Sequence, residues 1–378
     1  MNILITGIHG FVGTNLVNAL KSNHTIYGLD IVAPQKDGVL KTYTWAELEY
    51  IPAVDVVIHL AGKAHDTKNK TDAQVYFDIN TGLTRTIYDW FLVSEAKKFI
   101  FFSSVKAAAD KVEGEILTED VIPSPKGPYG ESKIKAEEYI LSKAVSGKRQ
   151  AASKKSGVRS SELGVLSAEY RVKSSESGVG SQELGVKSSE SAVGSQKSVV
   201  NSQQSTVRSQ QSPEDNSSEQ KTYILRPCMI HGPGNKGNLN LLYKVVKKGI
   251  PYPLGAFENR RSFCSVDNLS FVISELIEKE VASGIYNVGD DESLSTNELI
   301  TLMAATMGKP SRIWKWNKAL VQLAAKIGTV LHLPLNTERL QKLTENYVVS
   351  NAKIKQALGI DKMPFRAEEG LKKTVKSF

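Results

Sequence analysis

Short apolar runs alternate with amphipathic stretches through the first part of the chain. The runs lie at residues 2–6, 25–30, 54–62 and 97–104, and a further run follows much later at 221–227. Between the first two runs, residues 11–22 carry apolar side chains three and four positions apart, which predicts a helix. Strands that alternate with helices indicate an α/β fold with a doubly wound parallel sheet covered on both faces. From about residue 236 the pattern mixes helices with short strands, which predicts a smaller second lobe.

Residues 157–212 interrupt this order with eight successive seven-residue units. Valine holds the second place of every unit and serine the fourth, as in GVKSSES at 185–191. A coiled coil needs apolar positions alternately three and four apart, whereas the apolar places here are five and two apart. We expect a solvated, low-complexity segment with too little apolar surface to offset its ordering entropy. A weak helix or a β-arrangement of the valines stays open as an alternative.

Composition narrows the class of protein. The net charge of +8 comes from basic residues spread along 378 positions, which does not favour nucleic-acid binding. Two cysteines without a C-x-x-C pair argue against a disulfide framework or a cysteine zinc site, and no metal is expected. The N-terminus has no secretory leader pattern. Lys326 and His332 interrupt the apolar stretch 319–335, which predicts an amphipathic or buried helix rather than a membrane span. The expected location is the cytoplasm.

A glycine-rich turn follows the first predicted strand. In ITGIHGFVG, Gly7, Gly10 and Gly13 allow a tight turn and close backbone approach to a pyrophosphate, while the N-terminus of the next helix favours negative charge. The spacing is G-x-x-G-x-x-G, and three glycines alone also fit an ordinary turn. Asp30 ends the second strand 23 residues after Gly7. A carboxylate there accepts hydrogen bonds from ribose hydroxyls and repels a 2′-phosphate, which favours NAD, although a capping aspartate explains it equally well alone.

A second group of residues carries proton-transfer chemistry. In PYGESK, Tyr129 and Lys133 are four apart at the start of a predicted helix that should end near Gly147, so they share one face. An ammonium close to a phenol lowers the phenol's pKa from about 10 and fits it for acid–base work. Ser103 and Ser104 end the strand 97–104, where a serine hydroxyl can orient a substrate oxygen. Taken singly, the first pair is an ordinary helix surface and the serines are caps.

The order of these parts resembles the extended short-chain dehydrogenase/reductase family, in particular its nucleotide-sugar epimerases. The resemblance covers residues 1 to about 146 and 221–378. It implies a Rossmann-like fold with tightly held NAD, in which Tyr129 is the acid–base, Lys133 lowers its pKa and holds the nicotinamide ribose, and Ser104 orients the sugar oxygen. The residues expected to line the cofactor are Gly7, Gly10, Phe11, Val12, Gly13, Asp30, Leu60, Ala61, Gly62, Asn80, Tyr129, Lys133, Pro227 and Cys228.

The resemblance also implies substrate contacts. The segment NRRSFCSVDNL makes Arg261 the candidate for the nucleotide diphosphate, where a guanidinium suits phosphate oxygens. Asn238 and Ser104 are the other candidates. Three departures from the family pattern stand out. TYTWAELEY has no clear match for the adenine-contacting aspartate, and VKAAAD replaces the family's VYG. Val105 and Lys106 occupy the places where sugar 4,6-dehydratases carry Asp-Glu, which argues against water elimination.

The resemblance leads to a functional prediction with alternatives. We expect an NAD-dependent epimerase acting at C4 of an N-acetylated UDP-hexose for surface polysaccharide synthesis. A reductase of a UDP-4-keto-6-deoxy sugar is the main alternative, and a non-catalytic NAD-binding sensor is the third. The sequence leaves a homodimer open. The predicted divisions are 1–147 for the first part of the NAD-binding domain, 148–220 for the repeat insertion, 221–235 for the return strand and nicotinamide loop, and 236–378 for a mainly substrate-binding lobe.

Overall fold

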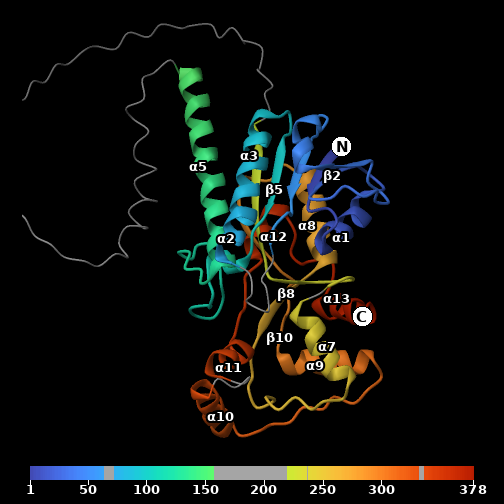
Figure 1. The fold of residues 1–378 in the computed structure, drawn as a ribbon, viewed down its shortest axis with the longest axis vertical. Coiled ribbons are helices and arrows are strands. Elements are labelled where there is room, and N and C mark those ends of the chain that lie inside the picture. Colours follow the sequence, from blue (N-terminus) through green and yellow to red (C-terminus); the bar gives the residue numbers. More distant parts are fainter. Residues whose placement is uncertain (64–71, 157–218, 236, 332–335) are drawn as a thin grey trace, which may run out of the picture. The chain divides into compact units, whose positions relative to one another are not determined.

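A computed structural model describes residues 1–63, 72–156, 219–235, 237–331 and 336–378. The seven-residue repeat at 157–212 lies outside these residues. Met1–Ser142 and Glu219–Phe378 form one compact unit, and Lys143–Ser218 form a second. The first unit contains both lobes and is shown in Figure 1.

A seven-stranded parallel sheet is the centre of the first unit. Its strands follow the order β3-β2-β1-β4-β5-β6-β9, and every neighbouring pair is parallel. The strands are β1 Asn2–Thr6, β2 Thr25–Asp30, β3 Lys41–Thr44, β4 Val56–His59, β5 Lys98–Phe102, β6 Lys221–Pro227 and β9 Gly284–Val288. A smaller sheet has the order β10-β8-β7, with β7 Met229–His231, β8 Arg261–Ser265 and β10 Ser293–Leu294. The predicted Rossmann-like fold is confirmed, because the order reverses beside β1.

Helices connect the strands and build the second lobe. In the first part of the chain they are α1 Phe11–Leu20, η1 Trp45–Tyr50, α2 Ala73–Tyr76, the π-helix η2 Phe77–Gly82, α3 Leu83–Val93, α4 Val105–Ala108 and α5 Pro128–Ser156. After β6 they are α7 Asn238–Lys247, α8 Val266–Glu278, α9 Thr296–Thr306, α10 Lys318–Val330, α11 Thr337–Thr344, α12 Ala352–Leu358 and α13 Ala367–Lys376.

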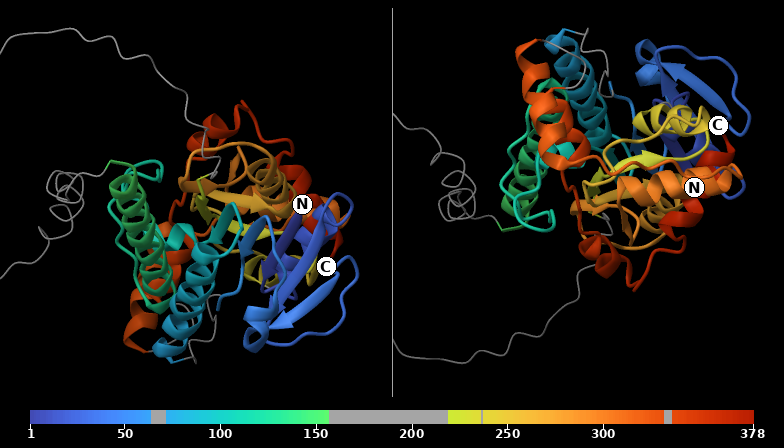
Figure 2. Two further views of the ribbon diagram at one scale, coloured as in Figure 1. Left: turned by 90° about the horizontal axis from the view of Figure 1, so that it is seen from above. Right: turned by 90° about the horizontal axis from the view of Figure 1, so that it is seen from below.

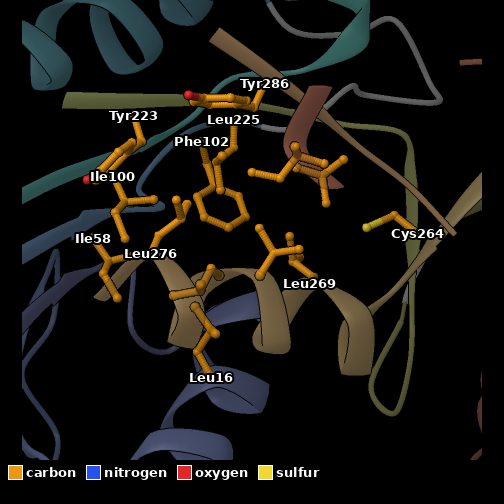
Figure 3. Packing of buried hydrophobic residues seen from close by; sticks show 14 of the residues in the cluster. Leu16, Ile58, Ile100, Phe102, Tyr223, Leu225, Cys264, Leu269, Leu276 and Tyr286 are labelled. Atoms are coloured by element: carbon orange, nitrogen blue, oxygen red, sulfur yellow. The ribbon is translucent and has the colours of Figure 1, made fainter. Parts of the chain in front are cut away.

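Alternating side chains of the strands enter two separate cores. On β5, Ile100 and Phe102 face one core, whereas Phe99 and Phe101 face the other. Helices α1 and α8 cover the first core and contribute Leu16 and Leu276 to the cluster that contains Phe102 (Figure 3). Helices α3 and α5 lie next to each other over the second core (Figure 2). Two apolar faces on strands of period two explain why the strand sequences are almost continuously hydrophobic.

The tail from residue 236 does more than form a lobe. Helices α7, α9 and α13 pack on β8 around Leu299 and Met303 as the lobe's own core. The same tail also supplies strand β9, which pairs with β6, and helix α8, which covers the sheet. Residues 221–378 therefore complete the first domain as well as building the second lobe.

Two helix predictions have different outcomes. The predicted end of the Tyr129 helix near Gly147 is wrong, because α5 continues to Ser156. Gly147 is followed by lysine, arginine, glutamine and alanine, which are strong helix formers and offset the roughly 1 kcal/mol that one glycine costs. The amphipathic helix predicted within 319–335 is present as α10. Among the described residues, no helix is long and apolar enough to cross a membrane.

Candidate active site

The glycine turn leaves no room for side chains. Gly7 has a φ of +66°, its N–H donates to the Leu29 carbonyl at 2.8 Å, and a Cβ there would lie 2.9 Å from the Ala61 backbone. A Cβ on Gly13 would lie 2.7 Å from the Gly7 oxygen. Gly10 caps α1 without using a side chain, so the first backbone N–H groups of α1 stay available. Such a cradle fits a pyrophosphate, and Phe11 and Val12 open the helix beside it.

Asp30 is held in place at the end of β2. Its Oδ2 accepts a hydrogen bond from the His9 N–H at 3.0 Å, and its Oδ1 accepts one from the Ile31 N–H at 2.8 Å. These two donors orient the carboxylate, and each oxygen still has lone pairs for further hydrogen bonds. The geometry fits an acceptor of ribose hydroxyls next to the glycine turn. The residues present therefore fit an NAD-type cofactor.

Three residues predicted from separate motifs, Gly62, Asn80 and Lys133, meet beyond the end of β4. Asn80 is fully buried in η2, and its Oδ1 accepts a hydrogen bond from the Lys63 N–H at 2.7 Å. A Cβ on Gly62 would lie 2.9 Å from that Oδ1 and 3.1 Å from the Lys133 Nζ. Asn80 also donates to the Ser132 hydroxyl at 2.9 Å, which joins η2 to α5. Asn80 thus holds the backbone of Lys63, which directly follows the segment Leu60, Ala61 and Gly62.

The sequence analysis missed a buried histidine that links β1 to this region. The Thr84 hydroxyl donates to the Asn80 carbonyl at 2.6 Å, so it can only accept from the His59 Nε2 at 2.9 Å. His59 therefore carries its proton on Nε2, and its Nδ1 accepts from the Thr6 hydroxyl at 2.7 Å. Burial, with a smaller contribution from the charge of Lys133, lowers the pKa of His59 well below its usual value. A histidine inside the apolar run at 54–62 was the available signal.

Ser104 and Tyr129 are brought together at the carboxyl end of β5. The Ser104 hydroxyl accepts a hydrogen bond from the Lys106 N–H at 3.2 Å and so caps α4. The same side chain hydrogen-bonds with the Tyr129 phenol. Capping and contact with the tyrosine are therefore compatible. Burial raises the pKa of Tyr129 above its usual value, and the hydrogen bond from Ser104 offsets only part of that increase.

Lys133 is 5% exposed and lies under the same site. Its Nζ donates to the Phe102 carbonyl at 2.7 Å and lies 5.1 Å from the centre of the Phe101 ring. Burial lowers the pKa of Lys133 to about 8, against a smaller opposing effect of Glu137. The expected lowering of the Tyr129 pKa by Lys133 is not the net result in the polypeptide. Burial dominates both groups, and it disfavours the charged form of each.

A buried ion pair behind the site was also missed. The Arg226 Nε donates to Glu137 Oε1 at 3.0 Å, the Arg226 Nη2 lies 2.5 Å from Oε2, and both side chains are almost fully buried. Ser103 donates to the same carboxylate. The cluster ties β6, β5 and α5 together. Its sequence signal was the spacing of 129, 133 and 137 on one helix face, with an arginine directly before Pro227.

The remaining candidates lie at the end of β6 and in the small sheet. Pro227 ends β6, and the buried Cys228 donates its N–H to the Val288 carbonyl at 2.9 Å. Burial raises the pKa of the Cys228 thiol, so it stays protonated. Arg261 begins β8, where its Nη2 donates to the Lys342 carbonyl and its Nε is buried without a partner among the described residues. Asn238 begins α7.

Tyr347 connects the small sheet to the Ser104 region. Its backbone pairs with Arg261, and its hydroxyl donates to the Ala109 carbonyl at 2.7 Å, just after α4. Arg261 itself stands on a different sheet from the Ser104–Tyr129 pair. If the diphosphate of a nucleotide sugar bound at Arg261, the sugar part of the same molecule would have to extend toward the end of β5.

The fold and the arrangement of the site resemble those of enzymes of the short-chain dehydrogenase/reductase type. Residues 3–154 match the model of the NAD dependent epimerase/dehydratase family. The family depends on NAD by its own description, in agreement with the cradle around Gly7 and Asp30.

Three known proteins show how far the similarity extends. The chain is 28% identical to the UDP-glucose 4-epimerase of Vibrio cholerae, in an alignment that covers 100% of this chain and 95% of that one. It is 24% identical to the N-acetyl-alpha-D-glucosaminyl-diphospho-ditrans,octacis-undecaprenol 4-epimerase of Escherichia coli O157:H7, covering 82% and 73% of the two chains. The structure of UDP-N-acetylglucosamine 4-epimerase from Bacillus cereus has the same fold, with a TM-score of 0.63, 16% identity, and coverage of 100% and 98%.

Proposed function

We propose that the protein is an NAD-dependent epimerase acting at C4 of a nucleotide-activated sugar, most specifically an N-acetylated UDP-hexose. The observation that carries this proposal is the hydrogen-bonded pair of Ser104 and Tyr129, with the buried Lys133 four residues after Tyr129 on helix α5. Two adjacent hydroxyls at the carboxyl end of a central strand can hold one sugar hydroxyl and move its proton. The match of residues 3–154 to the epimerase/dehydratase family model and the similarity to the Vibrio protein support the same reaction class.

Each residue of the site has a role in this proposal. The backbone around Gly7 and the Asp30 carboxylate would hold NAD, which would supply reversible hydride transfer at sugar C4. Ser104 holds the C4 oxygen. Tyr129 takes the hydroxyl proton during oxidation and returns it to the same oxygen during reduction. Lys133, buried beside Gly62, supplies the positive charge that stabilises the ionised phenol once that form is generated.

The substrate class is inferred from Arg261 and from two side chains near Ser104. The Arg261 guanidinium keeps a buried Nε–H free among the described residues, which suits a phosphate oxygen. Val105 is buried, and the Lys106 ammonium is held by the Asp110 carbonyl at 2.6 Å, so neither offers the acid–base pair of a dehydratase. The relatives named above act on glucosyl and N-acetylglucosaminyl diphosphates, which supports a sugar diphosphate as substrate.

One experiment separates the proposal from its main alternative, a 4-keto reductase. Purified protein is incubated with UDP-N-acetylglucosamine, without added reductant, and the sugar is followed by NMR. An epimerase restores its cofactor in every cycle, so conversion to the C4 epimer should proceed without reductant. Product that forms only in step with loss of NADH absorbance would establish the reductase instead. Bound NAD without any turnover would favour the sensor.

The wider setting stays a prediction. We predict a role in surface polysaccharide synthesis because the proposed substrate is an N-acetylated sugar. We predict a cytoplasmic location because the proposed substrate is a UDP-sugar. The homodimer is tested by light scattering on the purified full chain, where a monomer at working concentration would overturn it.

A further inference from the structure

Helix α10 lies at the end of the C-terminal lobe distant from the parallel sheet (Figure 1). It has a stripe of exposed apolar side chains. Leu320, Leu323, Ile327 and Val330 are between 49% and 75% exposed. Their spacing of three and four places them on one helix face. The other face buries Val321 and Ala325 against Leu254 and Leu340. The helix is therefore apolar on two sides, and only one of them belongs to the lobe's core.

Two exposed tryptophans directly precede α10 in the chain. Trp314 and Trp316 are 51% and 54% exposed, and their rings stack with centroids 6.3 Å apart. The backbone here is fixed, because the Trp314 N–H donates to the Tyr252 carbonyl at 2.8 Å and the Trp314 carbonyl accepts from the Gly255 N–H at 3.0 Å. Both indoles are thus presented outward by an ordered backbone.

The charged residues of the segment 309–331 have one sign. Residues 309–331 are all described and contain no aspartate or glutamate. The cations in this range are Lys309, Arg312, Lys315, Lys318 and Lys326, and all five are exposed. Those with hydrogen bonds to other segments meet neutral groups, as Arg312 does at the Gly249 carbonyl. The positive charge of this surface is therefore not cancelled by partners within the range.

We propose that the surface formed by Trp314, Trp316 and the exposed stripe of α10 binds an anionic lipid bilayer as an interfacial helix. Apolar and indole side chains enter the boundary between headgroups and acyl chains, while flanking lysines stay with the anionic headgroups. A 13-residue helix is about 20 Å long, which suits lying in the interface rather than spanning it. A second copy of this chain fits less well, because it would bring five cations against five.

The test uses the full chain in flotation with vesicles of phosphatidylcholine alone or mixed with phosphatidylglycerol. Wild-type protein should float only with the anionic vesicles, and less as salt rises. A Leu323→Gln/Ile327→Gln variant should bind at least tenfold more weakly, and Lys315→Gln/Lys326→Gln should weaken binding and flatten its salt dependence. The matched control Leu92→Gln/Val93→Gln changes two exposed apolar residues of α3 and should bind like wild type.

Several results would overturn the proposal. They are no flotation of wild type with anionic vesicles, equal flotation of the stripe variant, and equal loss in the α3 control. A wild-type dimer that ignores vesicles, and that becomes monomeric in the stripe variant by light scattering, would assign the surface to a second copy. The single variant Leu320→Gln, at a 67% exposed position, gives the same comparison if the double variant lacks a cooperative melt. No arm uses catalytic turnover, so the outcome is independent of the proposed reaction.

Discussion

Tyr129 is a phenol whose surroundings favour the neutral form. Burial raises its pKa, and its hydroxyl already has Ser104 as a partner. In the proposed reaction it must exchange one proton with the sugar oxygen in each half-cycle. Replacement by phenylalanine keeps the ring and removes that proton, so turnover should fall by about 10²–10⁴-fold. The rate is measured by NMR with UDP-N-acetylglucosamine, and bound NAD is assayed after denaturation. Near-normal turnover with NAD retained would mean that another group moves the proton.

The buried Lys133 ammonium lowers the free energy of unfolding, although the proposed site needs its charge. Its pKa of about 8 lies below the usual 10.4, so at neutral pH the folded protein holds an ammonium that burial disfavours. Lys133→Met should therefore raise the free energy of unfolding of the NAD-free protein at pH 7 by about 1–3 kcal/mol. Turnover and NAD retention should both fall. Urea unfolding measures the first effect, and a destabilised variant would contradict the argument.

The pH dependence supplies a second check on Lys133. Between pH about 8 and about 10.5 the unfolded chain keeps a proton that the folded chain has released. The contribution of Lys133 to the free energy of unfolding of the wild type therefore becomes more favourable as the pH rises across this window. The cost of burying its ammonium is fully present below pH 8. Lys133→Met should lack that contribution. Lys133→Arg stays charged throughout the window and serves as the control.

Individual site residues could be predicted where a sequence motif specified both the residue type and its position relative to a strand or helix. Gly7, Asp30, Ser104, Tyr129 and Lys133 all stand where their motifs placed them relative to strands and helices. Direct contacts were harder to predict. No sequence pattern gives the proton on His59 Nε2, because that assignment depends on a hydroxyl 25 residues away whose proton is already committed.

At the scale of elements, the Arg226–Glu137 pair joins a strand to the helix that carries Tyr129. Removal of one partner leaves a buried charge uncompensated, which typically costs about 3–5 kcal/mol. Arg226→Met should therefore lower the free energy of unfolding by that amount, as measured by urea unfolding. The double variant Arg226→Met/Glu137→Met removes both charges and should be more stable than Arg226→Met alone. Additive losses in a double-mutant cycle would show that the pair is not coupled.

Element types followed from local pattern, whereas boundaries depended on context. The strands 2–6, 25–30 and 221–227 coincide with β1, β2 and β6 because continuous apolar runs bounded by polar residues suit strands buried on both faces. Helix α5 passed its predicted end because one glycine among strong helix formers does not stop a helix. The π-helix η2 had no signal, since its geometry is set by Asn80 contacting Lys63 and Ser132.

For the molecule as a whole, the chain on either side of the insertion builds one compact unit. Strand β6 pairs with β5 along its length, and β9 and α8, which come later still, complete the sheet and its cover. Residues 1–142 and 219–378 therefore form one unit that shares a single central sheet. An insertion between α5 and β6 is tolerable only if it leaves this pairing intact.

Strand β6 begins at the edge of the sheet opposite the site. Lys221 begins β6 beside the start of β5, where its N–H donates to the Lys97 carbonyl at 2.7 Å. Ser104, by contrast, follows the carboxyl end of β5. Gln220 anchors the entry, because its side-chain amide donates to the Phe91 and Ala96 carbonyls at 3.0 Å each. The chain after the insertion thus re-enters the first unit at the amino edge of the sheet, away from the proposed chemistry.

We therefore predict that a short linker can replace residues 148–219 while Gln220 is kept. Loop-closure cost rises only with the logarithm of length, so a Gly/Ser linker of about ten residues should change stability by roughly 2 kcal/mol or less. NAD content and epimerase rate should stay within about twofold of wild type. A control variant that also replaces Gln220 by glycine should lose stability, since three carbonyls near the end of α3 then lose their donor. A linker variant that folds with NAD bound but turns over slowly would assign the insertion a part in the site or in assembly.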